Sequence, residues 1–202
     1  MKQLVIFARR PQLGCVKSRL AQDIGNIEAQ RFYRANLFAL ARRLSSGGGW
    51  KTRIAVTPDS STDMARLWPP HIGRLRQGAG TVGRRMTRCM ARFGCDPVVI
   101  VGSDIPQINR VHIVRAFASL RANDIVFGPS PDGGYWLVGA AQGARIGNLF
   151  ENVRWSTKSA LFDTMNNVKS GTRVSSIQTL ADIDDGNSYQ NWRDQGGKLL
   201  SI

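Results

Sequence analysis

Short hydrophobic runs alternate along the chain with longer stretches in which apolar residues recur every three to four positions. The first spacing is typical of strands and the second of helices. Residues 4–8 are continuously apolar, which predicts a strand buried on both faces. By the same reasoning we expect further strands at residues 53–57, 97–101, 124–127, 135–138 and 173–176. This order predicts a mainly parallel sheet between two layers of helices.

The helical spacing is clearest between Ile27 and Leu44, and this helix should end before the segment 45–49, which is rich in serine and glycine. Met86, Cys89, Met90 and Phe93 have the i, i+3, i+4, i+7 spacing of another helix. Further helices are expected around residues 62–67, at 113–120, after residue 156 and in the tail. The sequence has no low-complexity linker and no internal repeat, so we expect one domain over residues 1–202.

The composition argues against several classes of protein. The chain has 202 residues, of which 42% are hydrophobic, enough for one packed core. Its apolar runs are far shorter than the roughly 20 residues of a membrane-spanning helix. The N-terminus lacks the features of a secretory leader, so we expect a cytoplasmic protein. Three cysteines and only two histidines, His71 and His112, argue against a zinc site or a disulfide framework.

The charge is strongly unbalanced: 28 Lys and Arg against 14 Asp and Glu give a formal net charge of +14. Basic residues in segments 31–43, 84–92 and 110–121 keep open the alternative of a nucleic-acid-binding protein. The sequence contains no recognition-helix, RNP or KH motif, so nucleic acid is not the expected partner.

Four cations, Arg9, Arg10, Lys17 and Arg19, follow the first predicted strand. Open α/β sheets bind ligands beyond the carboxyl ends of their strands. With Gly14 providing backbone freedom, such a loop can surround a polyphosphate, although it is no Walker A motif. The alternative is a solvated basic surface.

The segment from Gly78 to Gly83 matches the pattern GxGxxG. It does not follow a hydrophobic strand, and no suitably placed acidic residue comes after it, so a dinucleotide fingerprint is rejected. We interpret it as a flexible loop that opens a helix, whose amides can contact a base, a ribose or a phosphate.

Three acidic segments are candidates for chemistry. Asp104 directly follows a buried strand and suits Mg²⁺, which combines one or two carboxylates with substrate phosphates; the alternative is a turn cap. Asp132 lies in a glycine-containing loop that is either a tight turn or a binding loop. The acidic group at 182–185 is either a helix-terminal cluster or a source of a second metal ligand or a sugar-hydroxyl acceptor.

Taken together, these segments resemble one known family in order along nearly the whole chain. The segments are 7–11, 14–20, 77–86, 102–106, 128–139, 153–157 and 182–184. The chain resembles the bacterial glycosyltransferase-A-like family, also called radical-SAM/selenodomain-associated transferases. That family is similar to the 2-phospholactate and molybdenum-cofactor guanylyltransferases. Two departures stand out: Arg9 replaces the usual lysine and Thr81 the usual aspartate.

The resemblance implies a three-layer α/β/α, Rossmann-like nucleotide-diphospho-sugar transferase fold that binds a nucleotide and Mg²⁺ or Mn²⁺. It assigns catalysis to Lys17, Arg19 and Asp104, and the metal to Asp104 with Asp132. The expected nucleotide and phosphate contacts are Arg9, Gly14, Lys17, Arg19, Gln77, Gly78, Gly80, Gly83 and Arg85. The expected acceptor contacts are Asp132, Gly133, Gly134, Tyr135 and Trp155.

The expected activity is transfer from an activated nucleotide, as glycosyl transfer from a nucleotide sugar or nucleotidyl transfer from an NTP to a phosphorylated acceptor. The fold alone does not separate these two reactions. A catalytically degenerate member of the same fold is a further alternative, because Thr81 replaces a carboxylate.

Overall fold

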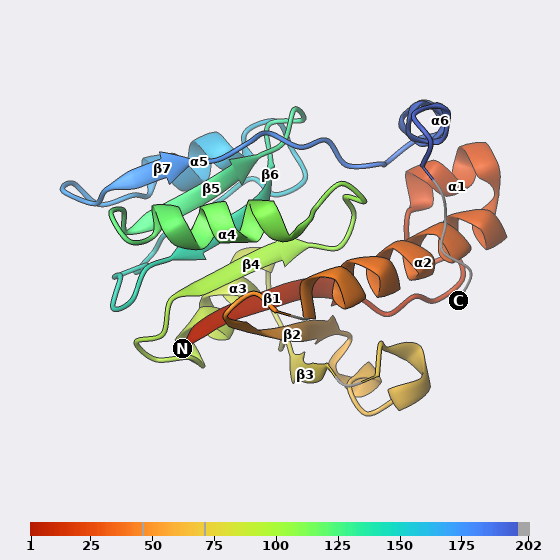
Figure 1. The fold of residues 1–202 in the computed structure, drawn as a ribbon. Helices are drawn as coiled ribbons and strands as arrows, with labels where there is room; N and C mark the ends of the chain where they lie inside the picture. The colour runs from red at the N-terminus through yellow and green to blue at the C-terminus, as the bar shows by residue number, and fades with distance from the viewer. Residues whose placement is uncertain (46, 71, 198–202) are drawn as a thin grey trace.

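The fold is an α/β/α sandwich around one seven-stranded sheet (Figure 1). The structure, a computed structural model, describes residues 1–45, 47–70 and 72–197; His71 and the last five positions of the predicted domain lie outside it. The strands are β1 (Lys2–Arg9), β2 (Trp50–Thr57), β3 (Gly73–Arg76), β4 (Val98–Gly102), β5 (Ile125–Pro129), β6 (Tyr135–Ala140) and β7 (Val174–Ser176). Their order in the sheet is β3-β2-β1-β4-β6-β5-β7.

The sheet is mainly parallel, as predicted, with one reversed strand. β6 pairs antiparallel with β4 on one side and with β5 on the other, whereas the remaining pairs are parallel. A short loop from β5 to β6 allows this reversal, because antiparallel neighbours need no long crossover. The loop of residues 130–134 therefore lies beside the end of β4.

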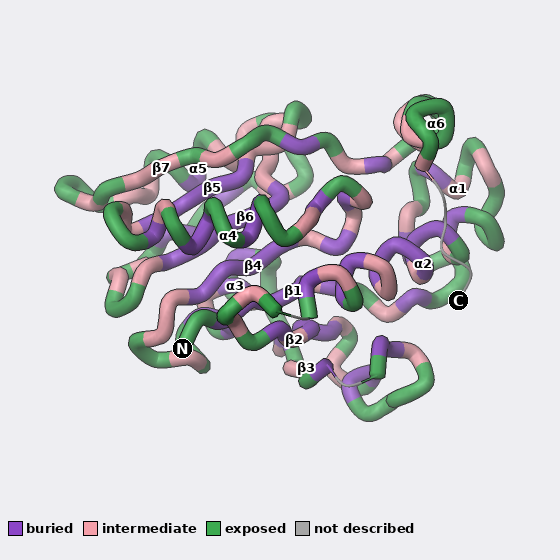
Figure 2. Tube along the Cα trace, viewed as in Figure 1, coloured by how far each residue is buried: buried purple, intermediate pink, exposed green. Residues whose placement is uncertain are grey.

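Helices cover both faces of the sheet. One face holds α2 (Asn26–Ser45) and α4 (Arg110–Ser119), and the other holds α3 (Val82–Ala91) and α5 (Ala160–Asn166). Side chains alternate along β1: Leu4 and Ile6 join the core under α2 and α4, and Val5 joins the core under α3. The continuously apolar β1 is thus buried between two layers, as its sequence predicts (Figure 2).

Two short helices extend the first helical layer. α1 (Ser18–Ile24) and α6 (Gly186–Asp194) pack near the N-terminal part of α2 (Figure 1). Leu20, Phe32 and Ile183 form a small separate core there, joined by Tyr189 and Trp192. No helix in the described ranges is long and apolar enough to cross a membrane.

The structure corrects several local predictions. The helix expected around residues 62–67 is absent, and two 3-10 turns, η1 (Asp59–Ser61) and η2 (Ala65–Leu67), take its place. The Trp68 indole donates to the carbonyl of Ser61 at 2.7 Å, which holds this segment in a compact non-helical form. Ile27, expected on the buried face, is 59% exposed because it lies in the first turn of α2.

Two elements were not predicted. β3 is an edge strand of sequence Gly-Arg-Leu-Arg, and charged side chains on an edge hide the strand pattern. α1 has seven residues, and only Leu20 among them is buried, so it is too short to show helical periodicity.

Candidate functional site

The loops that follow β1 and β4 leave the sheet side by side. The two strands are parallel neighbours, and Phe7 lies opposite Gly102 at their carboxyl ends. Tyr33 on α2 contacts both chain segments. Its hydroxyl accepts a hydrogen bond from the Arg9 amide at 2.9 Å and lies 3.2 Å from the Ser103 hydroxyl. Burial and the nearby charge of Asp104 raise the pKa of Tyr33, so the phenol stays neutral.

Asn36, one turn further along α2, donates to the Ser103 carbonyl at 2.7 Å. The loop bearing the cations and the loop bearing Asp104 are therefore attached to the same helix. A shift of the loop after β4 would break buried hydrogen bonds, which costs about 1–3 kcal/mol when a buried group is left unpaired.

Lys17 joins the two loops directly. Its ammonium lies 3.4 Å from Asp104 Oδ2 and 3.5 Å from Asp184 Oδ1, and its side chain is only 3% exposed. Arg19 is exposed and reaches the other oxygen of Asp184 at 3.0 Å. Lys17 also has a left-handed backbone, with φ of 51°, at the position just before α1. This conformation is unfavourable for a side chain with a Cβ, so the surrounding contacts must hold it.

The chain segment before α6 brings two more carboxylates to the same place. Asp185 caps α6, and the Gly186 amide donates to Asp23 at 2.6 Å, which anchors the segment against the end of α1. The Ile183 amide contacts the carbonyl of Asp104 at 3.4 Å. Docking of α6 thus places Asp182 and Asp184 beside the loop that follows β4.

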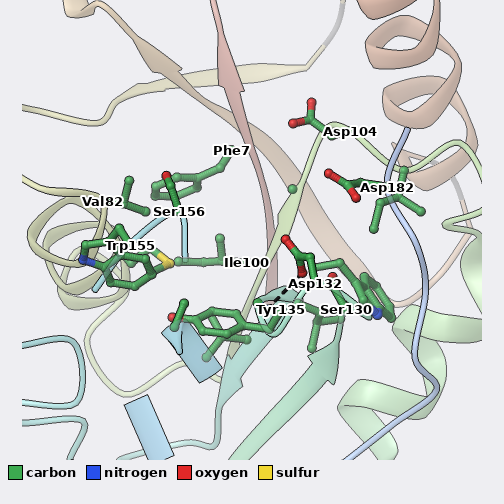
Figure 3. A pocket seen from close by; sticks show the side chains of 18 of the residues that line it. Phe7, Val82, Ile100, Asp104, Ser130, Asp132, Tyr135, Trp155, Ser156 and Asp182 are labelled. Carbon is green, nitrogen blue, oxygen red and sulfur yellow. Dashed lines mark hydrogen bonds between the residues drawn. The ribbon is translucent and has the colours of Figure 1, made fainter. Parts of the chain in front are cut away.

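A cavity of about 380 Å³ opens at this edge of the sheet (Figure 3). Three carboxylates, those of Asp104, Asp132 and Asp182, line one part of it. Burial raises the pKa of Asp182, and the like charges of Asp184, Asp132 and Asp104 add to this shift against the opposing charge of Lys17. The shift shows that the carboxylates share one electrostatic environment.

The loop between β5 and β6 presents Asp132 to the cavity. Asp132 Oδ1 accepts the Gly134 amide at 2.9 Å, so the side chain also shapes the turn. Gly133 has φ of +83°, and a Cβ there would lie 2.1 Å from the Lys158 carbonyl oxygen. Only glycine fits that position, and its part in the expected acceptor contacts is to allow the turn.

The aromatic residues expected at the acceptor site form one wall. Tyr135 packs edge to face between Phe127 and Trp155, with ring centroids 5.3 and 6.2 Å away. Trp155 in turn contacts Phe150. Of the expected acceptor contacts, Asp132, Gly134, Tyr135 and Trp155 line the cavity.

The glycine loop before α3 is held mainly by protein contacts. Gln77 is buried, and its amide donates to the Ala8 and Ala55 carbonyls at 3.2 and 2.8 Å. The guanidinium of Arg85 donates to the Gly80 carbonyl at 2.8 Å. The expected nucleotide contacts of Gln77 are therefore limited, because its side-chain amide is already used to join two strand ends.

The other expected phosphate and nucleotide residues are spread along the rim of this sheet edge. Arg9 is exposed and donates to the Cys15 carbonyl at 3.3 Å, and Gly14 has φ of +72° with open space around it. The Gly78 amide donates a hydrogen bond to Asp59 Oδ1 at 2.9 Å. Gly83 is buried beneath Phe150 and shapes the start of α3.

The donor set suits a hard divalent cation that also binds substrate. In the described ranges, no group of three His, Cys, Asp or Glu side chains is arranged to hold a metal ion. Mg²⁺ and Mn²⁺ commonly take one or two protein carboxylates and fill the remaining positions with phosphate oxygens and water. Asp104 and Asp132 line the same cavity and are carboxylates of the kind that such a partial site uses.

Residues 40–157 match the family described as "Uncharacterized protein conserved in bacteria (DUF2064)". The chain belongs to this family. The match includes Asp104, Asp132 and Trp155, whereas Lys17 and the acidic segment 182–185 lie outside it. No curated protein matches the chain in sequence.

Solved structures share the fold. A Desulfovibrio desulfuricans G20 protein, provisionally named a nucleotide-diphospho-sugar transferase, is 26% identical with a TM-score of 0.84, over 91% of this chain and 82% of that one. A nucleotidyl transferase from Methanothermobacter is 14% identical with a TM-score of 0.63, over 96% and 97%. Rv0371c of Mycobacterium tuberculosis H37Rv, in complex with manganese, is 14% identical with a TM-score of 0.51, over 94% and 96%. These similarities agree with the α/β/α fold expected from the sequence.

The sequence indicated the acidic group at 182–185 as a source of a second metal ligand or a sugar-hydroxyl acceptor, but it did not show that this segment lies beside Asp104. Three residues at or near the cavity were not predicted as site residues. Asn36 gave a usable signal, because an amide on the apolar face of a predicted helix needs a buried partner. Phe7 and Val82 resemble any core residue and gave none.

Proposed function

We propose that this protein is a metal-dependent transferase that acts on an activated nucleotide, either a nucleotide sugar or an NTP. The observation that carries the proposal is the placement of Lys17 between Asp104 and Asp184 at the carboxyl edge of the sheet. Cations beside carboxylates at this edge suit a diphosphate and its metal ion. The names of the Desulfovibrio and Methanothermobacter proteins support the same class of reaction. Within that class, the motifs favour the glycosyltransferase-A-like family.

In this proposal the cations act on the leaving group. Lys17 and Arg19 hold the phosphates, and the exposed Arg9 at the end of β1 is a further phosphate contact. Fixed cations stabilise the negative charge that develops as pyrophosphate or a nucleoside diphosphate departs. A divalent ion on Asp104 and Asp132 supplies Lewis-acid polarisation of phosphate oxygens when bound.

The acceptor attacks from the cavity. An acceptor hydroxyl forms the new bond to the transferred group, the bond from that group to the leaving phosphate oxygen breaks, and the hydroxyl proton passes to a carboxylate. Asp132 suits this last role as the alternative to holding the metal ion, which Asp104 then holds without it. Only Oδ1 of Asp132 is hydrogen-bonded within the described part of the chain, and the side chain faces the cavity.

The first prediction tests this function with nucleotides. Thermal unfolding of the full chain is followed with NTPs and nucleotide sugars, with and without Mn²⁺. A ligand at 100 times its Kd stabilises the wild type by about 2.7 kcal/mol. Lys17→Ala should lower kcat/KM by about 100-fold, and affinity with it, because one preformed cation is lost.

Lys17→Gly separates this charge effect from backbone strain. Glycine accepts the left-handed conformation, so Lys17→Gly should be more stable than Lys17→Ala by about 1 kcal/mol while it binds nucleotide equally poorly. Lys51→Ala, at the amino end of β2, is the matched control and should bind as the wild type does. Wild-type nucleotide affinity in Lys17→Gly would remove Lys17 from the site.

A further inference from the structure

The cavity has two chemically different ends. Its acidic end carries Asp104, Asp132 and Asp182, and its other end is a mainly apolar wall, beside which Ser156 lies (Figure 3). The apolar wall consists of Phe7, Val82, Met86, Ile100, Tyr135 and Trp155. These residues come from β1, α3, β4, β6 and the loop before α5, so tertiary folding alone creates the wall.

No lysine or arginine lines this cavity among the residues that the structure describes. Lys17 contacts Asp104, and Arg19 contacts Asp184. Neither cation forms part of the cavity wall. A phosphate against the apolar wall would lose water without gaining a cation, which is strongly unfavourable. Without a bound metal ion, the three nearby carboxylates would add repulsion.

Parts of the apolar wall are open to a ligand. Val82 is 44% exposed in the first turn of α3, and its side chain lies next to Trp155 (Figure 3). An aromatic or aliphatic body placed there covers this exposed surface, with a gain of roughly 25 cal/mol for each Å² of apolar area removed from water. A cavity of about 380 Å³ has the size of a small-molecule site.

Resting on the function proposed above, we infer that the acceptor is an alcohol with an apolar body and no phosphate group. Its body lies on the wall formed by Phe7, Val82 and Trp155, and its hydroxyl points to Asp132. This substrate class favours glycosyl transfer from a nucleotide sugar over nucleotidyl transfer to a phosphorylated acceptor.

Two probes with the same body test the inference, 2-phenylethanol and 2-phenylethyl phosphate. Their binding to the full chain is measured by saturation-transfer NMR titration in a metal-free buffer without nucleotide. In the wild type the alcohol should bind at least about tenfold more tightly than the ester, a difference of about 1.4 kcal/mol. Magnetisation should reach the phenyl protons, because the ring lies against the apolar wall.

Val82→Arg should reverse this preference, because it places a cation in the apolar wall. The variant should lose about tenfold in affinity for the alcohol and gain affinity for the ester. Val111→Arg is a matched control: Val111 is 54% exposed in the first turn of α4, outside the cavity, so the same substitution carries the same helix-end cost. Its probe preference should equal that of the wild type.

Three results would overturn the inference: equal or tighter binding of the ester by the wild type, no binding of the alcohol, or identical behaviour of Val82→Arg and Val111→Arg. The test is independent of the nucleotide experiment. Nucleotide binding that depends on Lys17, without a preference for the alcohol, would sink the acceptor class and leave the transferase proposal standing. A clear preference for the alcohol without nucleotide binding would overturn the transferase proposal and leave a cavity that binds apolar alcohols.

Discussion

Arg154 and Asp163 show how single residues position the aromatic wall. The Arg154 guanidinium donates to both Asp163 oxygens at 2.9 and 2.7 Å, and the Arg154 amide adds a third bond at 3.0 Å. This bidentate pair fastens the segment next to Trp155 onto α5. Hydrogen bonds from Arg154 lower the pKa of Asp163 to about 2. The geometry is of the kind in which an exposed ion pair contributes measurably.

A pH prediction follows at this scale. Because the pKa of Asp163 falls from 3.8 to about 2 on folding, the ion pair adds stability above pH 3.8 and loses it as the pH falls toward 2. Asp163→Asn should therefore unfold at a lower urea concentration than the wild type at pH 7, and the two midpoints should converge as the pH is lowered from 4.5 to 3. Asp194→Asn, at a carboxylate that accepts a hydrogen bond from Gln190, is the control and should show a smaller difference from the wild type at pH 7. A constant gap between Asp163→Asn and the wild type would show that the pair does not titrate as described.

At the scale of elements, the packing of α3 against the loop before α5 decides the shape of the cavity. Gly83 in the first turn of α3 lies beneath Phe150, where a Cβ would be 2.6 Å from the Phe150 carbonyl oxygen and 2.9 Å from Trp155. This close approach lets Val82 and Trp155 lie next to each other at the apolar end of the cavity. The GxGxxG pattern therefore has a packing role at its last glycine.

Gly83→Ala should destabilise the protein by about 1–2 kcal/mol, because overpacking outweighs the better helix propensity of alanine. It should also weaken the binding of 2-phenylethanol, since Trp155 must move. Urea unfolding and the NMR titration measure the two effects. Gly73→Ala, where the nearest atom lies 3.7 Å from the new Cβ, is the control and should leave both unchanged. A gain in stability for Gly83→Ala would contradict the described contact.

At the scale of the whole molecule, the net charge of +14 attracts any polyanion. This attraction is distinct from the proposed site, because Lys17 is buried while most of the basic residues lie on the surface. Binding to duplex DNA should weaken steeply with salt, in proportion to the number of phosphates contacted. The nucleic-acid alternative would require more than such nonspecific attraction.

Lys17→Ala should leave duplex affinity unchanged while it removes stabilisation by mononucleotides with Mn²⁺. Fluorescence anisotropy of a labelled duplex over a range of salt concentrations, set beside thermal unfolding with nucleotide, measures both. Equal loss of duplex and nucleotide affinity in Lys17→Ala would show that one site serves both ligands, in favour of the nucleic-acid alternative.

The amino-acid sequence alone determined the layered α/β architecture, since the continuously apolar β1 and the amphipathic α2 and α3 leave few other ways to bury their hydrophobic faces. It also indicated the edge at which Lys17 and Asp104 lie, because parallel neighbouring strands end on the same side. The charged edge strand β3 and the short α1 could not be predicted, because neither has a readable hydrophobic period.

Tertiary structure decided which side chains face one another at that edge. Asp182 and Asp184 reach Lys17 only because α6 docks on the core around Leu20 and Phe32, far away in the sequence. The apolar wall of the cavity likewise joins Phe7, Val82 and Trp155 from three separate segments. Local periodicity reports whether a residue is buried, but a cavity wall depends on distances between elements, and those are fixed only when the whole chain packs.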